Sequence, residues 1–544
     1  MFDHPLSTAL YRSLAHLLLI LWFISCSDPA KEDRSHLVFR YNEYGNITSL
    51  DPAFSRNLSN IWATTQLFNG LVQLDDRLNV IPDIAKHWTL SSNGLVYDFQ
   101  LRNDVYFHRH TAFGKEKTRK VVASDFVFSF SRLSNPQLAS PGGWVMQNVA
   151  KVEAKNEHQL TLTLKKPFPA FLGLLSMRYC SVVPKEVVQA IGEDFRKKPI
   201  GTGPFIFQDW EEDVKLVLRK NPLYYEKDKN GVALPYLEAI AISFIPDKQS
   251  EFMLFLQGKL DLLNALDNSY KDELLTQAGE LNSKYHDKIT LQKGPYLNTE
   301  YLGFYLDSPS PVIQSPLIRE AINIGFDRKK MMIYLRNNIG FVGDKGFIPK
   351  GLGGHPEKKS FLFQPNRAAK LVESFKKQSG LEAKINLSTD ANYIDLCEYI
   401  QRELQKIGIL VQVEVMPPAT LKQARSNGKI EMFRSNWIAD YPDAENYLSL
   451  FYSKNFSPLG PNYTHHQNPE FDAYYEKSFK INDPLERNAL YHTMDSIAMR
   501  SHPLIPLYYD QVVRFNQKGI VGLTINAVND LKLKKVKKQK TAKE

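Results

Sequence analysis

The chain has 544 residues, 43% hydrophobic and 23% charged, a composition typical of a soluble globular protein too long for a single core. The formal net charge is +9, but the last fourteen residues, LKLKKVKKQKTAKE, carry +6 of it. No basic stripe with interleaved aromatic residues occurs, so composition argues against a nucleic-acid partner. We expect residues 531–544 to form a solvated, disordered basic tail, with attraction to an anionic membrane surface as the alternative.

Residues 1–25 are typical of a signal peptide, with Arg12 ahead of the apolar run LLLILWFIS. That run is much shorter than the roughly 20 residues of a membrane span. FISC resembles a bacterial lipobox, in which cleavage before Cys26 leaves its thiol to be lipidated; an ordinary secretory signal is the alternative. Residues 26–35 would then be a tether, and the mature protein would be lipid-anchored in the periplasm or at the cell surface.

The first half of the body alternates strand-like and helix-like segments. Alternating apolar and polar residues predict strands over 95–102 and 158–166, after a short apolar strand over 36–42. SLDPA (49–53) predicts a turn, and IGTGPFIFQDW (200–210) a Gly/Pro turn that leads into a strand. Helical spacing predicts one helix over 60–75 that ends at Gly70, and another over 123–133 with Ser124 as its N-cap and Asp125 in its first turn.

The second half continues this mixed α/β pattern without repeats. One long amphipathic helix is predicted over 315–335, opened by Ser315 and Pro316. Further helices are predicted over 366–375 and 393–408, the latter closed by Gly408, and a strand over 409–416. Two cysteines remain, Cys180 and Cys397, which could pair in an oxidising compartment or stay independent and buried.

These segments, in this order, resemble the solute-binding proteins of peptide ABC importers, the large oligopeptide- and dipeptide-binding family, over about residues 36–520. The resemblance is carried by eleven landmarks: SLDPA, LFNGLVQLD, IAKHW, YDFQLRNDVYFH, ASDFVFSFSR, IGTGPF, NPLYYE, IREAINIGFDR, WIADYPDAENYL, NPEFDAYYEK and IPLYY. The basic segment RHTAFGKEKTRK (109–120) is longer than the turn that the family usually has there.

The resemblance implies an α/β, periplasmic-binding-protein-like fold of two lobes with mixed sheets, hinge strands and an extra inserted domain. Such proteins close around a ligand by hinge motion. The order of the landmarks predicts the division: lobe I comprises 36–68, 185–297 and 510–530, the extra domain 69–184, and lobe II 298–509.

The site implied by the resemblance lies around FRSNWIADYPDAENYL (433–448). A receptor for peptides in general has to bind an ammonium group, a carboxylate and backbone amides. In the family the aspartate of the Trp-x-Ala-Asp-Tyr motif binds the ammonium group, a role that falls here to Asp440. Trp437 would line a side-chain pocket, and the backbone around Asn436 and Ile438 would pair with the extended peptide. Without the resemblance, the sequence is also consistent with Asp440 as a turn cap and Trp437 as a core residue.

Two arginines nine residues apart approach the peptide carboxylate in the oligopeptide-binding proteins, and Arg425 and Arg434 have that spacing here. The planar guanidinium group suits a carboxylate. Both could instead be surface residues paired with Glu431 or Glu445.

Other landmark positions bear on the shape of the pocket. Tyr509, or its neighbour Tyr508, resembles the tyrosine that covers bound peptide, although adjacent strand residues face opposite sides, so one is structural. SPGGW (140–144) places glycines where relatives carry a cleft-lining tyrosine, for which Trp144 could substitute. Pro418 stands where the best-known relatives carry a pocket tryptophan.

We therefore expect a monomeric, extracytoplasmic receptor that binds short peptides and delivers them to a membrane permease with its ATPase subunits. The alternative is a receptor of the same fold for a nickel chelate, haem, or a cell-wall or signalling peptide.

The close histidine pairs, His108/His110 and His465/His466, lie outside the cleft motifs and are expected to be solvated. No nucleophile elbow, zinc-protease motif or P-loop occurs, so we expect neither catalysis nor a cofactor.

Overall fold

The computed structural model of the chain describes residues 37–264, 267 and 270–539. The predicted signal peptide, Cys26 and the tether lie outside these residues. Within the described part of the chain, none of the helices combines the length and the apolar character needed to cross a membrane.

A large mixed sheet joins the two halves of the molecule. Among the described residues it has eleven strands in the order β15-β14-β16-β12-β17-β11-β1-β10-β9-β8, with β13 paired to β17. The strands are β1 (Val38–Asn42), β8 (Phe205–Glu211), β9 (Lys215–Lys220), β10 (Ala239–Ser243), β11 (Leu262–Asn264), β12 (Ile289–Phe304), β13 (Phe341–Val342), β14 (Ala383–Thr389), β15 (Ile409–Val415), β16 (Met432–Ile438) and β17 (Leu504–Gln517).

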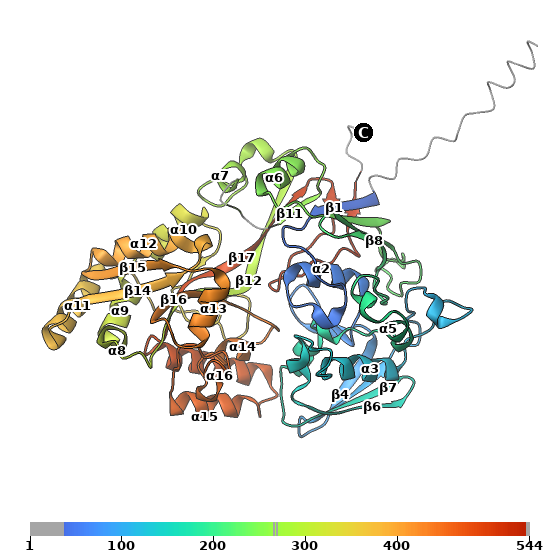
Figure 1. Ribbon diagram of the computed structural model, residues 1–544, viewed down its shortest axis with the longest axis horizontal. Helices are drawn as coiled ribbons and strands as arrows, with labels where there is room; N and C mark the ends of the chain where they lie inside the picture. Colours follow the sequence, from blue (N-terminus) through green and yellow to red (C-terminus); the bar gives the residue numbers. More distant parts are fainter. Residues whose placement is uncertain (1–36, 265–266, 268–269, 540–544) are drawn as a thin grey trace, which may run out of the picture.

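The strands β12 and β17 cross from one half to the other (Figure 1). They are 16 and 14 residues long and pair antiparallel from Ile289↔Gln517 to Gly303↔Leu504. One end of the pair lies beside β11 and the other beside β16, so each strand belongs to both halves. The predicted two-lobed fold with connecting strands is confirmed.

The half that contains the N-terminal region holds a second sheet of order β4-β5-β7-β6. Figure 1 shows it below α2 and beside α3. Its residues build a separate apolar core, which includes Phe99, Leu162 and Phe126. The elements here are β2 (Val72–Leu74), β3 (Val80–Pro82), β4 (Ala85–Leu90), β5 (Val96–Leu101), β6 (Val149–Asn156), β7 (Gln159–Leu164), α2 (Leu58–Leu67), α3 (Ala123–Leu133), α4 (Phe171–Leu175) and α5 (Lys185–Ile191).

The other half consists of β14–β16 with helices around them and two apolar cores. Its helices are α8 (Pro311–Gln314), α9 (Pro316–Gly325), α10 (Arg328–Arg336), α11 (Pro365–Ser379), α12 (Ile394–Gln405), α13 (Pro418–Ser426), α14 (Glu445–Leu448), α15 (Pro469–Ser478) and α16 (Pro484–Met499). The short helices α6 (Lys248–Leu256) and α7 (Lys271–Leu274) lie near β11. The residue boundaries assigned above to the lobes and the extra domain stay a prediction.

The expected disorder of the basic tail is wrong for residues 531–539. Leu531, Leu533 and Val536 are fully buried in the core that also contains α2 and β1. Lys534 pairs with Glu226 at 2.8 Å, and residues Lys537–Lys538 form β19 against β18 (Ile520–Val521). The apolar residues between the lysines face inward, while the aliphatic stems of Lys534 and Lys538 bring their charged ends to Glu226 and Asp261.

Three predicted helices differ in detail. The 315–335 segment is two helices, because α9 ends at Gly325 and the Asp327 side chain accepts from the backbone N–H of Lys330 to start α10. The helix predicted over 60–75 spans Leu58–Leu67, and β2 follows it. The N-cap of α3 is Val122 rather than Ser124, and Asp125 accepts a hydrogen bond from the Val122 backbone N–H at 2.9 Å.

The two cysteines are both free and buried, in different cores. Burial raises the pKa of Cys180 to about 12 and that of Cys397 to about 11. Of the two alternatives, the structure has the independent, buried thiols.

Candidate ligand-binding site

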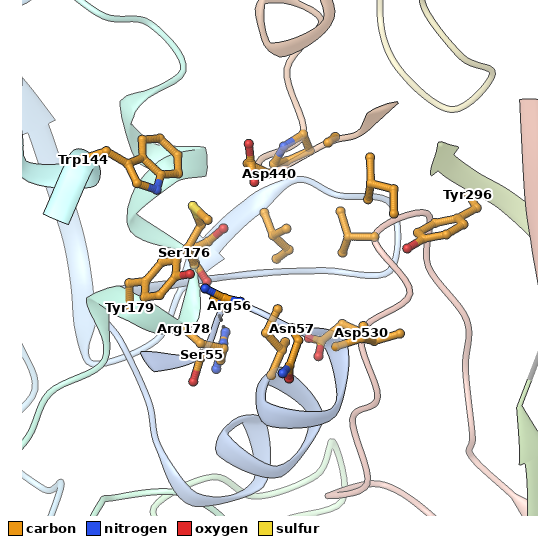
Figure 2. A pocket seen from close by; sticks show the side chains of 18 residues that line it. Ser55, Arg56, Asn57, Trp144, Ser176, Arg178, Tyr179, Tyr296, Asp440 and Asp530 are labelled. Atoms are coloured by element: carbon orange, nitrogen blue, oxygen red, sulfur yellow. Dashed lines mark hydrogen bonds between the residues drawn. The ribbon is translucent and has the colours of Figure 1, made fainter. Parts of the chain in front are cut away.

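A cavity of about 400 Å³ lies between the two halves of the molecule. Figure 2 shows the side chains that surround it. Most of them come from the segment before α2 and its first turns, from the part of the chain that contains the second sheet, from the end of β16 and from the C-terminal loop. The lining residues are Ser55, Arg56, Asn57, Leu58, Ile61, Leu74, Trp144, Ser176, Met177, Arg178, Tyr179, Tyr296, Ile438, Ala439, Asp440, Pro442, Val528 and Asp530.

Asp440 projects into this cavity from the loop after β16 (Figure 2). Asn446, in α14, holds the loop: its side-chain oxygen accepts from the Asp440 backbone N–H at 3.2 Å and from Trp437 Nε1 at 3.0 Å. The carboxylate is accessible to solvent, but the surrounding walls remove enough water that burial raises its pKa, an effect that a hydrogen bond from Asn446 opposes. No cationic group of the described chain offsets this desolvation, so Asp440 is an unpaired anion in a cavity wall.

The facing walls carry Trp144, Tyr179 and two arginines. Trp144, which the sequence analysis named as a possible substitute for the tyrosine of relatives, lines the cavity. Tyr179 packs where a side chain on Gly142 would stand, since a Cβ there would come within 2.4 Å of the tyrosine ring. The glycine that replaces the family's cleft tyrosine therefore makes room for a tyrosine from another segment. Burial, and after it the charge of Asp440, raises the pKa of Tyr179 to about 12, while Arg56 lowers it.

The structure does not bring Arg425 and Arg434 to this cavity. Arg434 is 5% exposed and pairs with Glu300 and, at 3.5 Å, with Asp390. Arg425 donates to Ser435 Oγ, and its guanidinium lies 4.1 Å from the centre of the Tyr463 ring. Both groups are thus engaged inside the second half of the molecule, and their predicted contact with a ligand carboxylate stays a prediction.

Ile438 lines the cavity, whereas Trp437 and Asn436 contact their own half of the molecule. Trp437 is half-buried and bonded to Asn446, and Asn436 Nδ2 donates to Asn298 Oδ1 at 3.3 Å. The strand that bears them, β16, pairs with β12 along its whole length, but with β14 only at Met432 and Phe433. Among the described strands, none covers the other edge of β16 from residue 434 to 438.

The two tyrosines of IPLYY lie in the crossing strand β17 and do not line the cavity. Both are fully buried. Tyr508 accepts from Arg336 at 3.1 Å, and Tyr509 donates to the Gly346 carbonyl at 2.7 Å. They face different partners, as expected for neighbours in a strand, and in this conformation both bind protein groups.

The histidine pairs are bonded to protein groups rather than arranged around a metal. His108 and His466 are buried, contrary to the expectation that they are solvated, and each bonds a backbone carbonyl, that of Gly203 at 3.1 Å and that of Phe451 at 3.0 Å. Burial lowers the pKa of His108 to about 4. The described residues contain no group of three or more His, Cys, Asp or Glu side chains arranged to hold a metal ion.

A larger hollow of about 860 Å³ adjoins the cavity at Trp144 and is lined by aromatic residues including Tyr441 and Phe479. Its carboxylates already have partners: Glu445 accepts from the hydroxyl of Tyr475, and Glu476 pairs with Lys454 at 2.7 Å. The smaller cavity, with an unpaired carboxylate, is the better candidate for recognition of a charged ligand.

Arg56, Arg178 and Tyr179 are among the cavity residues that sequence reasoning missed. Arg56 directly follows the SLDPAFS stretch, whose first five residues were recognised as a landmark but not as part of the site. Arg178 and Tyr179 lie in MRYC, which has no pattern that singles it out.

Two lobes joined by crossing strands, with a charged cavity between them, define a bilobal ligand-binding protein. The sequence profile of the bacterial extracellular solute-binding proteins, family 5, matches residues 79–458, and the chain belongs to this family. The family comprises solute-binding proteins of ABC importers.

Relatives support the assignment along nearly the whole chain. The glutathione-binding protein GsiB of Escherichia coli O1:K1 is 24% identical over 495 residues, which cover 88% of this chain and 90% of that protein. Di/tripeptide-binding protein 2 of Pseudomonas aeruginosa is 25% identical over 498 residues, 87% of this chain and 89% of that protein.

Solved structures show the same architecture. DppA of Helicobacter pylori in complex with the peptide STSA superimposes with a TM-score of 0.76 at 25% identity, covering 92% of this chain and 98% of that one. HbpA2 of Haemophilus parasuis has a TM-score of 0.80 at 22% identity, with 92% and 100% covered, and shows the fold.

Proposed function

We propose that the protein is the substrate-binding component of an ABC importer that takes up short peptides, and that the cavity between the lobes is the peptide site. The observation that carries the proposal is the unpaired carboxylate of Asp440 in the wall of that cavity. Relatives named as di/tripeptide- and glutathione-binding proteins, and a neighbour determined with STSA, support a peptide ligand.

The ammonium group of the peptide would bind Asp440. A carboxylate that is partly desolvated and lacks a cationic partner is destabilised until an opposite charge arrives. An ammonium group supplies that charge and three hydrogen-bond donors. Because Asn446 already fixes the loop on both sides of Ile438, the carboxylate is positioned before the ligand arrives.

The peptide backbone would pair with the free edge of β16. Along residues 434–438 no described strand pairs with β16 on the side away from β12, and Ile438 lines the cavity. An extended peptide added there forms main-chain hydrogen bonds that do not depend on its side chains. This arrangement suits a receptor that recognises peptides as a class.

Closure of the lobes about β12 and β17 would exclude water and strengthen the charge pairs. The closed receptor would then deliver its ligand to a membrane permease with its ATPase subunits, without catalysing a reaction itself. We propose that the mature chain is a monomer held outside the cytoplasmic membrane by a lipid on Cys26, which lies outside the described residues.

Native mass spectrometry of the chain starting after Cys26, purified without refolding, tests this function. Ligands that co-purify are released and fragmented. Short peptides are the expected result. A metal complex, haem or another non-peptide mass would contradict the proposed function, and a single defined peptide would identify a specialised receptor within it.

A further inference from the structure

Arg56 and Arg178 lie in the wall of the cavity that faces Asp440 (Figure 2). Arg56 belongs to the segment before α2, and Arg178 begins a short 3-10 helix, Arg178–Cys180. We propose that Arg56 and Arg178 form an anion subsite that binds the C-terminal carboxylate of the peptide. The inference rests on the proposed function, because it names the residues that would bind the second charged group of the same peptide. It restricts the ligand to short peptides with a free carboxyl end.

Arg56 is exposed to the cavity and precedes the N-cap residue of α2, Asn57. The first turn of this ten-residue helix contains no acidic residue. The partial positive charge of the helix N-terminus therefore adds to that of the guanidinium rather than being neutralised. No described carboxylate forms an ion pair with Arg56.

Arg178 is half-buried, and its guanidinium donates to the Ser176 carbonyl at 3.2 Å. That contact orients the side chain but leaves its charge without an anionic partner among the described residues. A half-buried guanidinium is a planar, weakly hydrated donor set that suits a carboxylate.

Two other acidic groups, Asp530 and Asp83, are occupied by other partners. Asp530 also lines the cavity, but it accepts from Thr65 Oγ1 at 3.1 Å and lies 3.9 Å from Lys532. Burial raises the pKa of Asp83, an effect that the charges of Lys534 and, last, Arg178 oppose, and Asp83 accepts from Asn69 at 3.1 Å and from Tyr225. Neither carboxylate forms an ion pair with the two arginines.

The size of the cavity limits the length of the ligand. Asp440 and Arg56 line the same cavity as Tyr179, and the charge of each shifts the Tyr179 pKa. An extended chain spans about 3.3–3.6 Å per residue, so a peptide of two or three residues is about 7 to 11 Å long. A cavity of about 400 Å³ lies toward the small end of ligand pockets, which range over roughly 300–1,000 Å³.

A competition experiment tests the subsite. The probes are synthetic tripeptides with alanine, leucine, phenylalanine, lysine, glutamine and glutamate side chains, each supplied as the free acid and as the C-terminal amide in equal amounts. Bound ligands are released and quantified by mass spectrometry for the wild type, Arg56→Gln, Arg178→Gln and Arg425→Gln. Arg425 is the matched comparison, because it is the arginine that the motif spacing, rather than the cavity, assigns to the carboxylate.

We expect the wild type to bind the free acid about 30-fold or more tightly than the amide. This is the size of the affinity change that follows when one partner of a desolvated charge pair is removed. Arg56→Gln and Arg178→Gln should lose most of that preference, and Arg425→Gln should keep it. Arg56 is exposed, so its variant folds and decides the result even if Arg178→Gln is unstable.

Three outcomes would overturn the subsite, and they differ in what they say of the proposed function. If neither form binds, the peptide function fails with it. If both forms bind equally, or only Arg425→Gln loses the preference, peptides are the ligands but the carboxylate is not held by Arg56 and Arg178. If an amide that carries a glutamate binds as well as the free acid, the site takes a side-chain carboxylate instead of the terminal one.

Discussion

Replacing Asp440 by asparagine should weaken peptide binding by removing the charge that is proposed to hold the ammonium group. Asparagine has nearly the same shape, so the loop held by Asn446 should stay in place. The change therefore isolates the electrostatic contribution of the carboxylate from its packing.

The size of the effect follows from the environment of Asp440. An exposed ion pair contributes about 0–1 kcal/mol, whereas removing one partner of a buried pair costs about 2–5 kcal/mol. Asp440 is accessible to solvent in the cavity wall, yet its pKa is already raised by burial. We expect a loss of about 2–3 kcal/mol, which corresponds to about a 30- to 150-fold higher Kd.

Isothermal titration calorimetry with a tripeptide that the wild type retains measures this loss directly. Asp287→Asn, which alters an exposed carboxylate outside the cavity, is the matched control. Unfolding temperatures of both variants should equal that of the wild type. If Asp440→Asn binds within about threefold of the control, a difference below 1 kcal/mol, the role assigned to Asp440 is wrong.

Four other results are expected. Because the Asp440 pKa is raised and an ammonium ligand needs the ionised form, peptide affinity should fall on acidification, starting at a higher pH than for an ordinary carboxyl; affinity constant from pH 7 to 4 would contradict this. Leu533→Ala should lower the free energy of unfolding by about 2–5 kcal/mol, as a fully buried leucine requires, and an unchanged denaturant midpoint would show that the tail is not packed. Burial raises the pKa of Asp495 to about 7. Between about pH 4 and 7 this side chain is therefore protonated in the folded state and ionised in the unfolded state, so its contribution to stability declines as pH rises. Asp495→Asn should reduce the decline by on the order of 2 kcal/mol in unfolding curves at pH 5 and 8, and an equal decline in both proteins would refute this. Neither Cys180 nor Cys397 should react with iodoacetamide at pH 7.5 unless denaturant is present, as read from intact mass, because both thiols are buried with raised pKa values.

Local pattern was enough to predict many elements of the fold. Alternation located β5 and β7, and the Gly/Pro turn at IGTGPF located the start of β8. The order of the landmarks then implied two lobes and strands that cross between them. These features depend on residues close in sequence, or on a chain order that the family shares.

The errors arose where a local helix cap or a tertiary contact outweighed the repeating pattern. Helical spacing continues through residues 315–335, and only the cap formed by Asp327 separates α9 from α10. In the tail, the many lysines led to the prediction of a solvated, disordered segment. That prediction overlooked Leu531, Leu533 and Val536, which pack into a core formed with distant segments of the chain.

The site divides in the same way. The resemblance assigned Asp440 to the candidate site from its motif alone, and the structure places it in the cavity wall, where the nearby Asn446 holds its loop. Arg56 and Arg178 come from separate segments and meet only in the folded molecule. Arg434, conversely, matched the expected spacing, but the structure pairs it with Glu300, 134 residues away in the chain. Sequence spacing alone does not show whether a guanidinium is free for a ligand.

A crystal structure of the mature chain with a bound tripeptide is the most direct test of the proposed peptide site. The account predicts the peptide in the cavity between the lobes, with its ammonium group against the Asp440 carboxylate, its backbone along the free edge of β16 and its carboxylate at Arg56 and Arg178. A peptide bound with its ammonium group away from Asp440, or outside this cavity, would contradict it.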